Sequence, residues 1–541
     1  MKRKLLMLTA LALCLALLCG CTTIATSEWM QNLFPVGDEA VAAQQTGSVN
    51  GSEDKQEVKQ VVTETYTALE SFGLAYQPDY GLQPYNCQSL NNRIIFSFLY
   101  EPLFAVTSSY EAEPILAESY FVTDDGRTTT VKLRSGVTFH DGSALTAADA
   151  AYSIESAAGS EYYGSRLRFI TSAEAQDDLT LVLSTSEAYE CLPLLLDIPI
   201  IKSGTKDEVS PPGTGPYEFA ETKLTRCENW WRDTAPLVDF DEIALTVSST
   251  AADVRDNFEY QKVNMVLTDP NSSAFAGFHN DYELWDARLP IMQYIGYNIT
   301  SKVFSNYGLR SAITYAIDRD HLATDIMGGF AQPAVLPASP QAPFYDGKLA
   351  NTYGYNLTKF SQQLESASVE DMDNDGTLDL YVPSLGYAVS VAGTMIVCSS
   401  SYQRVEAATE VVNALNALGF KITLKTLELS EFRQALQTGN FDLYYGEIRL
   451  SNNFDLTPFF SASGSMCYGG LDDSVMLNLC TQALANNGNS YNLYKRLCER
   501  GYITPVLFKN LAVYTTRGSI AHPTDYIDWF LIPPADETAE G

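Results

Sequence analysis

Some side chains in this sequence have the types and the spacing that catalysis requires. His140 and Asp141 in Phe-His-Asp-Gly place an imidazole beside a carboxylate, a combination that general acid–base catalysis uses. Asp-Gly directly after a strand is also an ordinary turn sequence, and we expect a turn here. No Gly-x-Ser-x-Gly sequence, which would mark a nucleophilic serine, occurs. We therefore expect no catalytic site and no enzyme, with a secreted hydrolase acting through paired carboxylates as the less favoured alternative.

Metal ligands are scarce apart from one acidic stretch. The four histidines are scattered and the cysteines lack CxxC spacing, so a zinc site has little support. Positions 1, 3, 5 and 9 of a calcium-type loop would be filled by Asp371, Asp373, Asp375 and Asp379. Gly376 suits the turn, but Val382 stands where such a loop needs a bidentate Glu. We expect a turn that binds Ca²⁺ weakly or not at all, and we expect no cofactor.

Paired tyrosines and one arginine are candidates for ligand contact. Rigid aromatic faces with hydroxyl tips suit the walls of a cleft that holds peptide side chains or sugar rings. Two such pairs stand out among the 32 tyrosines, Tyr162 with Tyr163 and Tyr444 with Tyr445. Arg449 offers a forked donor for a carboxylate, but it is two residues from Glu447 and could pair with it on one strand face. Both interpretations of Arg449 stay open.

The elements that would position these residues alternate between strand and helix periods. Thr128 to Leu133 alternates as a strand, and Thr146 with Asp149 forms a variant of the capping box that opens a helix. Apolar residues recur with helical spacing from Leu309 to Ile317, which predicts a buried helical stripe. This alternation predicts an α/β fold with layered sheets and helices.

The C-terminal half contains a β-α-β order. A helical stripe over 411–418 stops at Gly419, and alternation over 420–424 predicts a strand. Ser430 then caps a helix that ends near Gly439, and 441–448 reads as the next strand. Such units place ligand positions at the carboxyl ends of their strands.

Composition and the N-terminal segment restrict the partners and the compartment. Lys and Arg number 34 against 66 Asp and Glu, and the net charge of −32 argues against nucleic-acid binding. Lys2 to Lys4 are basic and Leu5 to Leu18 are apolar, a pattern typical of an export signal. About 20 apolar residues are needed to cross a bilayer, so cleavage is favoured over a permanent anchor helix.

The end of that signal predicts lipid attachment. Leu18-Cys19-Gly20-Cys21 resembles the bacterial lipobox, which implies cleavage before Cys21 and a lipid on its sulfur. The alternative is an ordinary secretory signal in which Cys21 is incidental. We therefore expect a signal peptide over 1–21, a flexible turn-rich tether over 22–60, and an exported protein held on the outer face of the cell membrane or in the periplasm. Three of the ten cysteines belong to the export segment, so the odd remainder leaves at least one unpaired.

Several ordered blocks carry a family resemblance. They are Tyr100-Glu101-Pro102-Leu103-Phe104, Leu116-Ala117-Glu118-Ser119, Asp124-Asp125-Gly126, Leu133-Arg134-Ser135-Gly136-Val137, Phe139-His140-Asp141-Gly142, Leu145-Thr146-Ala147-Ala148-Asp149, Gly213-Thr214-Gly215-Pro216-Tyr217, Asn229-Trp230-Trp231, and Leu309-Arg310-Ser311-Ala312-Ile313 through Ala316-Ile317-Asp318-Arg319. Over about residues 60–520 the chain resembles the bacterial family 5 extracellular solute-binding proteins, the oligopeptide-, dipeptide- and nickel-binding components of ABC transporters.

This resemblance implies a periplasmic-binding-protein-like, two-lobed clamp (type II, similar to cluster C) with an additional peripheral α/β domain. The implied regions are a first lobe of 61–108, 187–285 and 506–541, an insertion of 109–186, and a second lobe of 286–505. Crossovers near 294–298 and 502–505 would act as hinges. The conserved-looking blocks need not touch ligand.

The resemblance also implies ligand contacts in the first lobe. In relatives, a strand after Leu-x-Pro pairs with the peptide backbone, and the matching motif is Leu82-Gln83-Pro84. This would put Gln88, Ser89 and Leu90 at the cleft. A plain edge strand is the alternative.

In the second lobe, peptide-binding members carry an Asp that pairs with the ammonium group of the peptide. Gly446 aligns with their motif, but Leu450 falls where the Asp would be. Either Glu447 or Asp455 has taken over that charge, or the ligand is not a free-amine peptide, because a buried unpaired ammonium is costly. We include Asn452 in this predicted binding segment.

The resemblance implies a monomeric receptor that captures a small solute, most simply an oligopeptide, and presents it to permease subunits of an ABC importer. An oligosaccharide binder is the alternative within the same fold, favoured by the missing ammonium anchor and the tyrosine pairs.

Overall fold

The computed structural model describes residues 69–160, 162–232, 236–270, 278–486, 490–520 and 526–527. The predicted signal peptide, the tether and Cys21 lie outside these residues. Within them, no helix has the length and the apolar run that crossing a bilayer requires. No disulfide bond joins Cys87, Cys191, Cys227, Cys398, Cys467, Cys480 and Cys498, all of which the structure describes.

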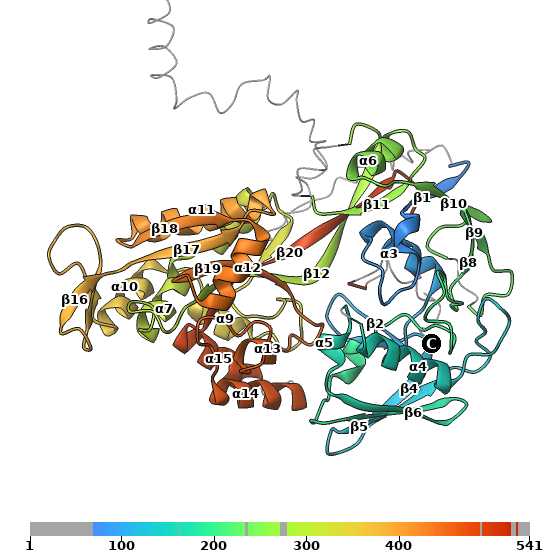
Figure 1. The fold of residues 1–541 in the computed structure, drawn as a ribbon, viewed down its shortest axis with the longest axis horizontal. Helices are drawn as coiled ribbons and strands as arrows, with labels where there is room; N and C mark the ends of the chain where they lie inside the picture. The colour runs from blue at the N-terminus through green and yellow to red at the C-terminus, as the bar shows by residue number, and fades with distance from the viewer. Residues whose placement is uncertain are drawn as a thin grey trace, which may run out of the picture. The chain divides into compact units, whose positions relative to one another are not determined.

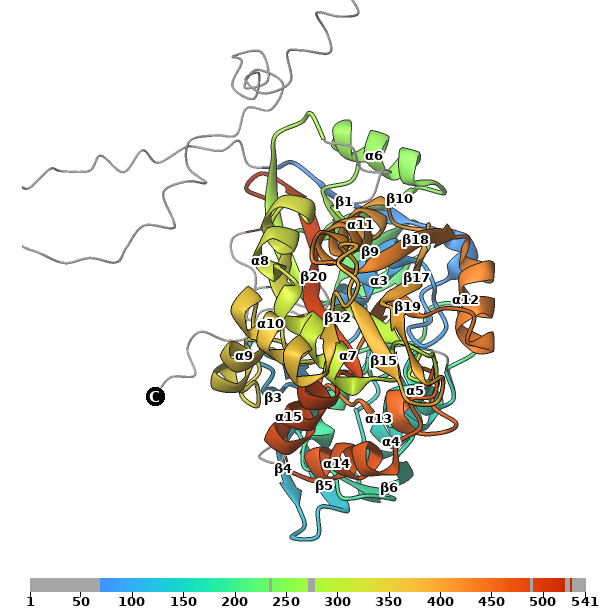
Figure 2. The same cartoon turned by 90° about the vertical axis from the view of Figure 1, so that its left-hand side faces the viewer.

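The largest sheet has eleven strands, and two long strands lie at its centre. These are β12 (Tyr282–Tyr297) and β20 (Ile503–Thr516), which pair antiparallel side by side (Figures 1 and 2). The short strand β13 (Ala331–Pro333) also pairs with β20. On one side follow β19 (Leu443–Arg449), β17 (Ala392–Cys398) and β18 (Lys421–Leu427). On the other side follow β11 (Met265–Thr268), β1 (Phe72–Tyr76), β10 (Glu242–Val247), β9 (Lys223–Arg226) and β8 (Tyr217–Ala220).

The long strands contain irregularities that bend a sheet. The pairing of β12 with β20 shifts register between Ala287 and Ile291 and again between Gln293 and Tyr294. The hinge segments predicted near 294–298 and 502–505 lie at the ends of these two strands. The exact boundaries of the lobes stay a prediction.

A separate antiparallel sheet forms within the predicted insertion. Its order is β4 (Ala117–Val122), β5 (Thr128–Leu133), β7 (Thr180–Thr185) and β6 (Ile170–Asp177), and α4 (Ala147–Ala158) packs on β6 and β7. The predicted strand over Thr128–Leu133 is confirmed. The predicted capping box is confirmed as well, since the Thr146 backbone N–H donates to Asp149 Oδ2 at 2.9 Å.

In the second lobe, α11 (Tyr402–Ala417) connects β17 to β18, and α12 (Leu429–Thr438) connects β18 to β19. Alternate residues of β17 face different cores: Met395 and Val397 pack in the cluster that contains α11, whereas Ile396 and Cys398 pack in the cluster that contains α12. The two helices therefore cover opposite faces of the strand. The predicted β-α-β order is confirmed, although β17 lies between β18 and β19 in the sheet.

One helix boundary differs from the prediction. The helix α12 is capped by Glu428, not by Ser430, because the extended backbone conformation that precedes the helix is found at Glu428. The helix ends as expected at Gly439, which takes a left-handed conformation with φ of 68°.

The remaining helices pack around these sheets. They are α3 (Leu90–Leu99), α5 (Gly164–Leu167), α6 (Ala251–Glu259), α7 (Tyr307–Ile313), α8 (Arg319–His321), α9 (Gly347–Tyr353), α10 (Leu357–Ser366), α13 (Thr457–Phe460), α14 (Ser474–Ala485) and α15 (Ser490–Arg500). The smaller strands are β2 (Phe104–Val106) with β3 (Ala112–Pro114), and β14 (Val369–Glu370), β15 (Asp379–Val382) and β16 (Tyr387–Ser390). The predicted stripe over 309–317 is buried, as expected.

Two buried arginines tie that stripe to the start of β20. Arg310 Nε donates to Gly501 O at 2.8 Å, and Arg319 Nε donates to Pro505 O at 3.0 Å. Burial lowers the pKa of each guanidinium to about 10. The two guanidinium groups therefore act as hydrogen-bond donors to buried backbone carbonyl oxygens.

Three of the blocks that carry the resemblance meet at one fully buried carboxylate. Glu101 Oε2 accepts hydrogen bonds from Thr214 Oγ1 at 2.8 Å and from Trp231 Nε1 at 2.6 Å. Arg232 Nε lies 3.1 Å from Glu101 Oε1 and forms an ion pair with it. Burial raises the pKa of Glu101, although Arg232 and the two hydrogen-bond donors oppose that rise.

The Phe-His-Asp-Gly turn packs against the same segment. His140 Nε2 lies 3.1 Å from Gly215 O, and His140 Nδ1 accepts from the Gly213 backbone N–H at 3.3 Å. Asp141 pairs with Lys202. Both ring nitrogens of His140 therefore contact the backbone, which supports the turn interpretation of this motif.

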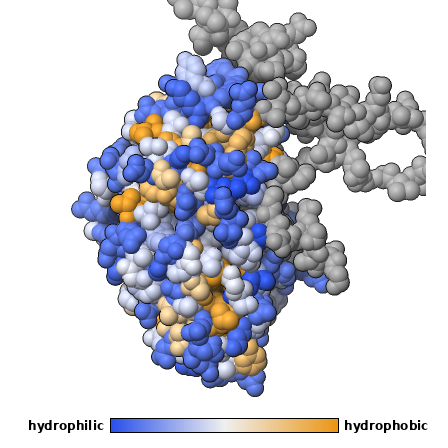
Figure 3. All heavy atoms as spheres, turned by 90° about the vertical axis from the view of Figure 1, so that its right-hand side faces the viewer, coloured by the Kyte–Doolittle hydropathy of each residue, from blue (hydrophilic) through white to orange (hydrophobic). Residues whose placement is uncertain are grey.

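The surface shown in Figure 3 is mostly hydrophilic, and its apolar atoms lie in small separate patches. Scattered apolar atoms of this kind are normal for a protein surface.

Candidate functional site

Two adjoining cavities lie where the three predicted regions meet. Cavity A has a volume of about 40 Å³ and is lined by Arg93 and Phe96 of α3, by Tyr163 of the insertion, and by Asp197. Cavity B has a volume of about 300 Å³ and is lined largely by residues 448–459, which begin at the end of β19. Tyr162, Arg166 and Arg449 line both cavities. The first lobe, the insertion and the second lobe thus all contribute side chains.

A tyrosine ring in contact with two guanidinium groups lines both cavities. Arg93 Cζ lies 3.6 Å from the centre of the Tyr162 ring, and Arg449 Cζ lies 5.7 Å from it. Arg449 Nη1 also donates to Tyr162 Oη at 2.7 Å. Cations over an aromatic face are favourably placed, because the face carries the negative part of the ring quadrupole.

Ion pairs and hydrogen bonds connect the segment after β19 to the other two regions. Arg168 pairs with Asp455, and Asn452 Nδ2 donates to Leu194 O at 3.1 Å and to Asp197 Oδ2 at 3.0 Å. Asp197 also pairs with Arg166 at 2.6 Å. These contacts join residues 452–455 to residues 166–168 and 194–197, which belong to three different predicted regions.

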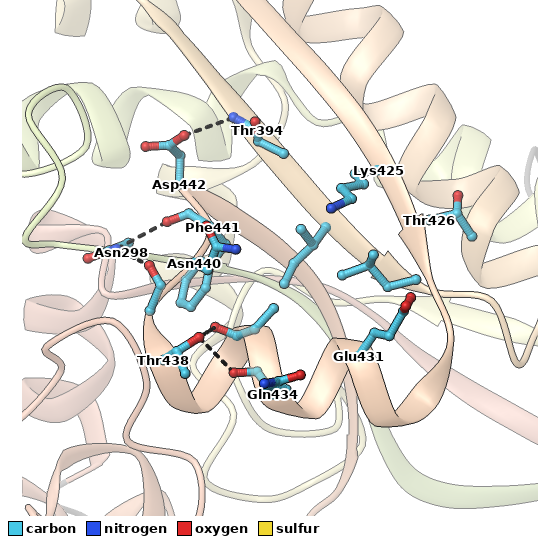
Figure 4. Close-up of a pocket in the computed structure, with 14 residues that line it drawn as sticks. Asn298, Thr394, Lys425, Thr426, Glu431, Gln434, Thr438, Asn440, Phe441 and Asp442 are labelled. Atoms are coloured by element: carbon cyan, nitrogen blue, oxygen red, sulfur yellow. Dashed lines mark hydrogen bonds between the residues drawn. The ribbon is translucent and has the colours of Figure 1, made fainter.

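A larger cavity, cavity C, lies between α12 and the strands β17 and β18 and has a volume of about 860 Å³ (Figure 4). The Thr394 backbone N–H donates to Asp442 Oδ2 at 2.9 Å, and Asn298 Nδ2 donates to Phe441 O at 3.1 Å. Residues of the predicted second lobe alone line it. Cavities A and B, which residues of all three predicted regions line, are therefore taken as the candidate site.

The family model described as "Bacterial extracellular solute-binding proteins, family 5 Middle" matches residues 111–466. The chain belongs to this family. Among curated relatives, the glutathione-binding protein GsiB of Pectobacterium atrosepticum is 28% identical over 311 residues, which cover 53% of this chain and 59% of that protein. The GsiB of Escherichia coli K12 is 28% identical over 48% of this chain and 54% of its own length. The chain thus spans little more than half the length of these relatives in the alignments.

Solved structures of family 5 proteins share the fold. The oligopeptide-binding protein AppA of Bacillus subtilis, solved with a nonapeptide, is 20% identical with a TM-score of 0.57, covering 86% of this chain and 99% of its own. NikA of Brucella suis, solved with Fe(III)-EDTA, is 18% identical with a TM-score of 0.63, covering 86% of this chain and 100% of its own. The predicted α/β, periplasmic-binding-protein-like fold is therefore confirmed.

Five of the predicted ligand-binding residues in this family 5 chain come together at cavities A and B. They are Tyr162, Tyr163, Arg449, Asn452 and Asp455. Sequence reasoning did not select Arg93, Arg166, Arg168 or Asp197, which line the same cavities. One signal was present for Arg93, because it is the only charged residue in the apolar helix sequence Leu90–Leu99. Nothing local marked Asp197.

Tyr444 and Tyr445 do not form the wall of a cleft, and this prediction is wrong. Both are buried, because β19 lies inside the sheet and is covered on both faces. Tyr444 Oη is 3.2 Å from Tyr294 Oη, and Tyr445 Oη donates to Gln293 Oε1 at 2.9 Å. Gly446 serves the same packing, since a Cβ there would lie 2.8 Å from Tyr294 Cζ.

Of the two interpretations left open for Arg449, pairing with Glu447 is not found, because Glu447 pairs with two other cations. Glu447 Oε1 accepts from Arg404 Nη2 at 2.7 Å, and Lys509 Nζ lies 3.3 Å from Glu447 Oε2. Burial by itself would raise the pKa of Glu447, but Arg404 and Lys509 together hold it below its ordinary value. Glu447 is already neutralised by two cations from its own chain, so its carboxylate is not free to pair with a ligand ammonium group. Lys509 also pairs with Asp269 at 2.9 Å.

The strand predicted after Leu82-Gln83-Pro84 does not form. Cys87 to Ser89 lack strand pairing, and Ser89 instead caps α3, its hydroxyl accepting from the Asn92 backbone N–H at 3.2 Å. Gln88, Ser89 and Leu90 are not among the residues that line the cavities described above.

The acidic loop is closed by its own hydrogen bonds. Oxygens of Asp371, Asp373 and Asp375 lie within 4.8 Å of one another. Asp371 accepts from the Gly376 N–H at 2.9 Å and Asp375 accepts from the Thr377 N–H at 2.7 Å, while Asp379 accepts from the Met372 N–H at 3.1 Å. Carboxylates of this kind stabilise a turn without an ion. The weak Ca²⁺ assignment stays a prediction.

Proposed function

We propose that this family 5 protein captures a small peptide-like solute between its lobes, in cavities A and B, and delivers it unchanged to permease subunits of an ABC importer. The observation that carries the proposal is that all three predicted regions line one pair of adjoining cavities. A ligand enclosed in this way contacts both lobes, so its binding energy can drive closure. The names of the relatives support a peptide, since one is called glutathione-binding and another was solved with a nonapeptide.

Other functions receive less support from the site. An oligosaccharide binder would use the Tyr162 and Tyr163 rings as stacking surfaces, but Arg93 already covers the Tyr162 ring at 3.6 Å. Catalysis at His140 would need a ring nitrogen that exchanges protons with a substrate, and both nitrogens contact the backbone. We therefore propose a receptor without catalytic activity.

Ligand binding should stabilise the folded protein by mass action. A matching peptide at 100 times its dissociation constant adds about 2.7 kcal/mol to the free energy of unfolding. Thermal denaturation with separate pools of short peptides, oligosaccharides and metal chelates measures this effect. Only the peptide pool should raise the melting temperature, and Tyr162→Ala should reduce the rise.

A control variant and the response to each ligand pool separate this proposal from its competitors. Gln434→Ala, in cavity C, is the control and should leave the rise unchanged. Stabilisation by oligosaccharides alone would favour the other binder. No stabilisation by any pool, or a loss of the effect in Gln434→Ala instead of Tyr162→Ala, would contradict the proposed site.

We further propose that the mature protein is a monomer exported from the cell and held on the outer face of its membrane by lipid on Cys21. Replacing Cys21 by Ala removes the sulfur that would carry the lipid, so the protein should move from the membrane fraction to the soluble exported fraction. Cell fractionation followed by immunoblotting measures the shift. Replacing Cys19 by Ala is the matched control and should leave the protein on the membrane. Retention of the Cys21→Ala protein on the membrane would rule out the anchor.

A further inference from the structure

The described residues that line cavities A and B are rich in arginine, although the whole protein is strongly acidic. The charged ones among them are Arg93, Arg166, Arg168, Arg449, Asp197 and Asp455. Arginines thus outnumber aspartates four to two among the described lining residues, whereas the chain as a whole carries −32. A local reversal of sign inside a cavity with low-dielectric walls attracts anions and repels cations.

The aspartates of these cavities already have partners. Asp197 pairs with Arg166 at 2.6 Å and accepts from Asn452 at 3.0 Å. Asp455 pairs with Arg168 and accepts from the Thr457 backbone N–H at 2.7 Å. Among the described lining residues, each carboxylate is thus engaged by an arginine. An ammonium group of a ligand would have to break one of these pairs to gain a counter-ion.

Arg93 is the cation whose charge is not neutralised in this way. Its residue is 8% exposed, and its hydrogen bonds go to Cys87 O at 3.3 Å and Tyr163 Oη at 3.5 Å, both neutral groups. Among the described residues, no carboxylate forms an ion pair with it. A buried guanidinium without an anionic partner is costly, and the planar fork of arginine suits a carboxylate. Arg93 lines cavity A, so a ligand carboxylate placed there would supply the missing charge.

The sizes of the two cavities fit such a ligand. Cavity A, with about 40 Å³, has room for one small group of a few heavy atoms, since about 10–15 Å³ of such space holds a water molecule. Cavity B, with about 300 Å³, is at the lower limit of the volumes found for small-molecule sites. The space therefore suits a carboxylate in cavity A and the remainder of a short chain in cavity B.

We infer that the solute captured by this protein is a short anionic peptide, one of whose carboxylates binds Arg93 in cavity A while Arg449 and the Tyr162 ring hold the adjacent part of the chain. This inference rests on the proposed function and adds the charge of the ligand to it. A positively charged peptide is excluded because the cavity walls repel it and no described lining carboxylate is available to receive it.

Isothermal titration calorimetry with matched tripeptides tests the charge preference. The probes are Ala-Glu-Ala, Ala-Ala-Ala and Ala-Lys-Ala with free C-terminal carboxylates, together with the C-terminal amide of Ala-Ala-Ala. Ala-Glu-Ala should bind about tenfold or more tightly than Ala-Lys-Ala, and amidation should weaken Ala-Ala-Ala by a similar factor. Equal affinities for the acidic and basic peptides would overturn the inference and leave the proposed function standing. Absence of binding by every peptide would overturn the proposed function, and the inference with it.

Variants locate the carboxylate contact. Arg93→Gln should reduce the affinity for Ala-Glu-Ala about tenfold or more and leave the affinity for the amidated peptide nearly unchanged, whereas Arg93→Lys should keep part of the preference. Arg255→Gln, at an exposed arginine outside both cavities, is the matched control. If Arg93→Gln does not fold, as judged by circular dichroism, Arg449→Gln takes its place. This variant should lower the ratio of the affinity for Ala-Glu-Ala to the affinity for Ala-Lys-Ala. An affinity ratio that stays at the wild-type value in a folded Arg93→Gln or Arg449→Gln protein would overturn the assignment.

Discussion

Replacing Glu101 by alanine is expected to lower the free energy of unfolding by about 3–5 kcal/mol. The substitution removes the carboxylate that forms an ion pair with the Arg232 guanidinium, whose side chain is 9% exposed. It also removes the acceptor for Trp231 Nε1–H and Thr214 Oγ1–H. Because Thr214 and Trp231 belong to two separate sequence blocks, the loss should loosen the packing between them. Urea denaturation followed by tryptophan fluorescence measures the change.

A double-mutant cycle distinguishes this mechanism from a simple packing defect. If the cost arises from loss of the Glu101–Arg232 ion pair, the variant with both Glu101→Ala and Arg232→Ala should be less destabilised than the sum of the two single variants. Glu242→Ala, which breaks an exposed ion pair with Lys223, is the control and should cost less than about 1 kcal/mol. A Glu101→Ala protein within about 1 kcal/mol of wild type would contradict the expectation.

The second large effect is a pH dependence from His140. Burial lowers the pKa of this imidazole to about 4. The hydrogen bond to Gly215 and the nearby Asp141 favour the charged form and oppose this decrease, but burial has the larger effect. The neutral ring with its proton on Nε2 satisfies both contacts, because Nε2–H donates to Gly215 O and Nδ1 accepts from Gly213 N–H. A second proton on Nδ1 would face that N–H, so the folded state resists protonation.

The sign of the effect follows from proton counting. Between the ordinary pKa of about 6.5 and the folded value of about 4, the unfolded chain binds one proton that the folded protein does not bind. The contribution of the neutral His140 ring to the free energy of unfolding is therefore fully present above pH 6.5 and is lost as the pH falls toward 4. At 1.36 kcal/mol for each pH unit, the loss amounts to roughly 3 kcal/mol.

Denaturation curves measured from pH 7 to pH 4 for wild type and His140→Gln test this. Carboxylates also titrate near the lower end, so the difference between the two proteins is the informative quantity. The wild type should lose about 3 kcal/mol more than His140→Gln over this range. His279→Gln, whose side chain is 91% exposed, is the control and should follow the wild type. Parallel curves for wild type and His140→Gln would show that His140 is not kept neutral by the fold.

Elements whose signals come from near neighbours were predictable from the sequence. The strand Thr128–Leu133 and the capping box of Thr146 with Asp149 were found as predicted, since alternation and capping involve residues only a few positions apart. The ordered blocks predicted the family, and the family predicted the fold. The start of α12 was placed two residues late because Ser430 is a good cap by type, whereas the chain already turns at Glu428.

The candidate site was predicted only in part. Tyr162, Tyr163 and Arg449 were selected from their chemistry and do line the cavities. Tyr444 and Tyr445 have the same chemistry but are buried, because β19 lies inside the sheet. Residue type alone does not distinguish a cleft wall from a core, since both need large aromatic surfaces.

Residue identity within short windows was enough to predict many of the elements and the family. Which charges neutralise one another depends on the folded arrangement instead. Arg93, Asp197 and Arg449 line one cavity although they come from three distant segments. Arg404 and Lys509, likewise distant in sequence, both form ion pairs with the carboxylate of Glu447. The charge of a cavity is a sum over groups that the fold places side by side, and that sum cannot be formed before the long-range pairing of strands and lobes is known.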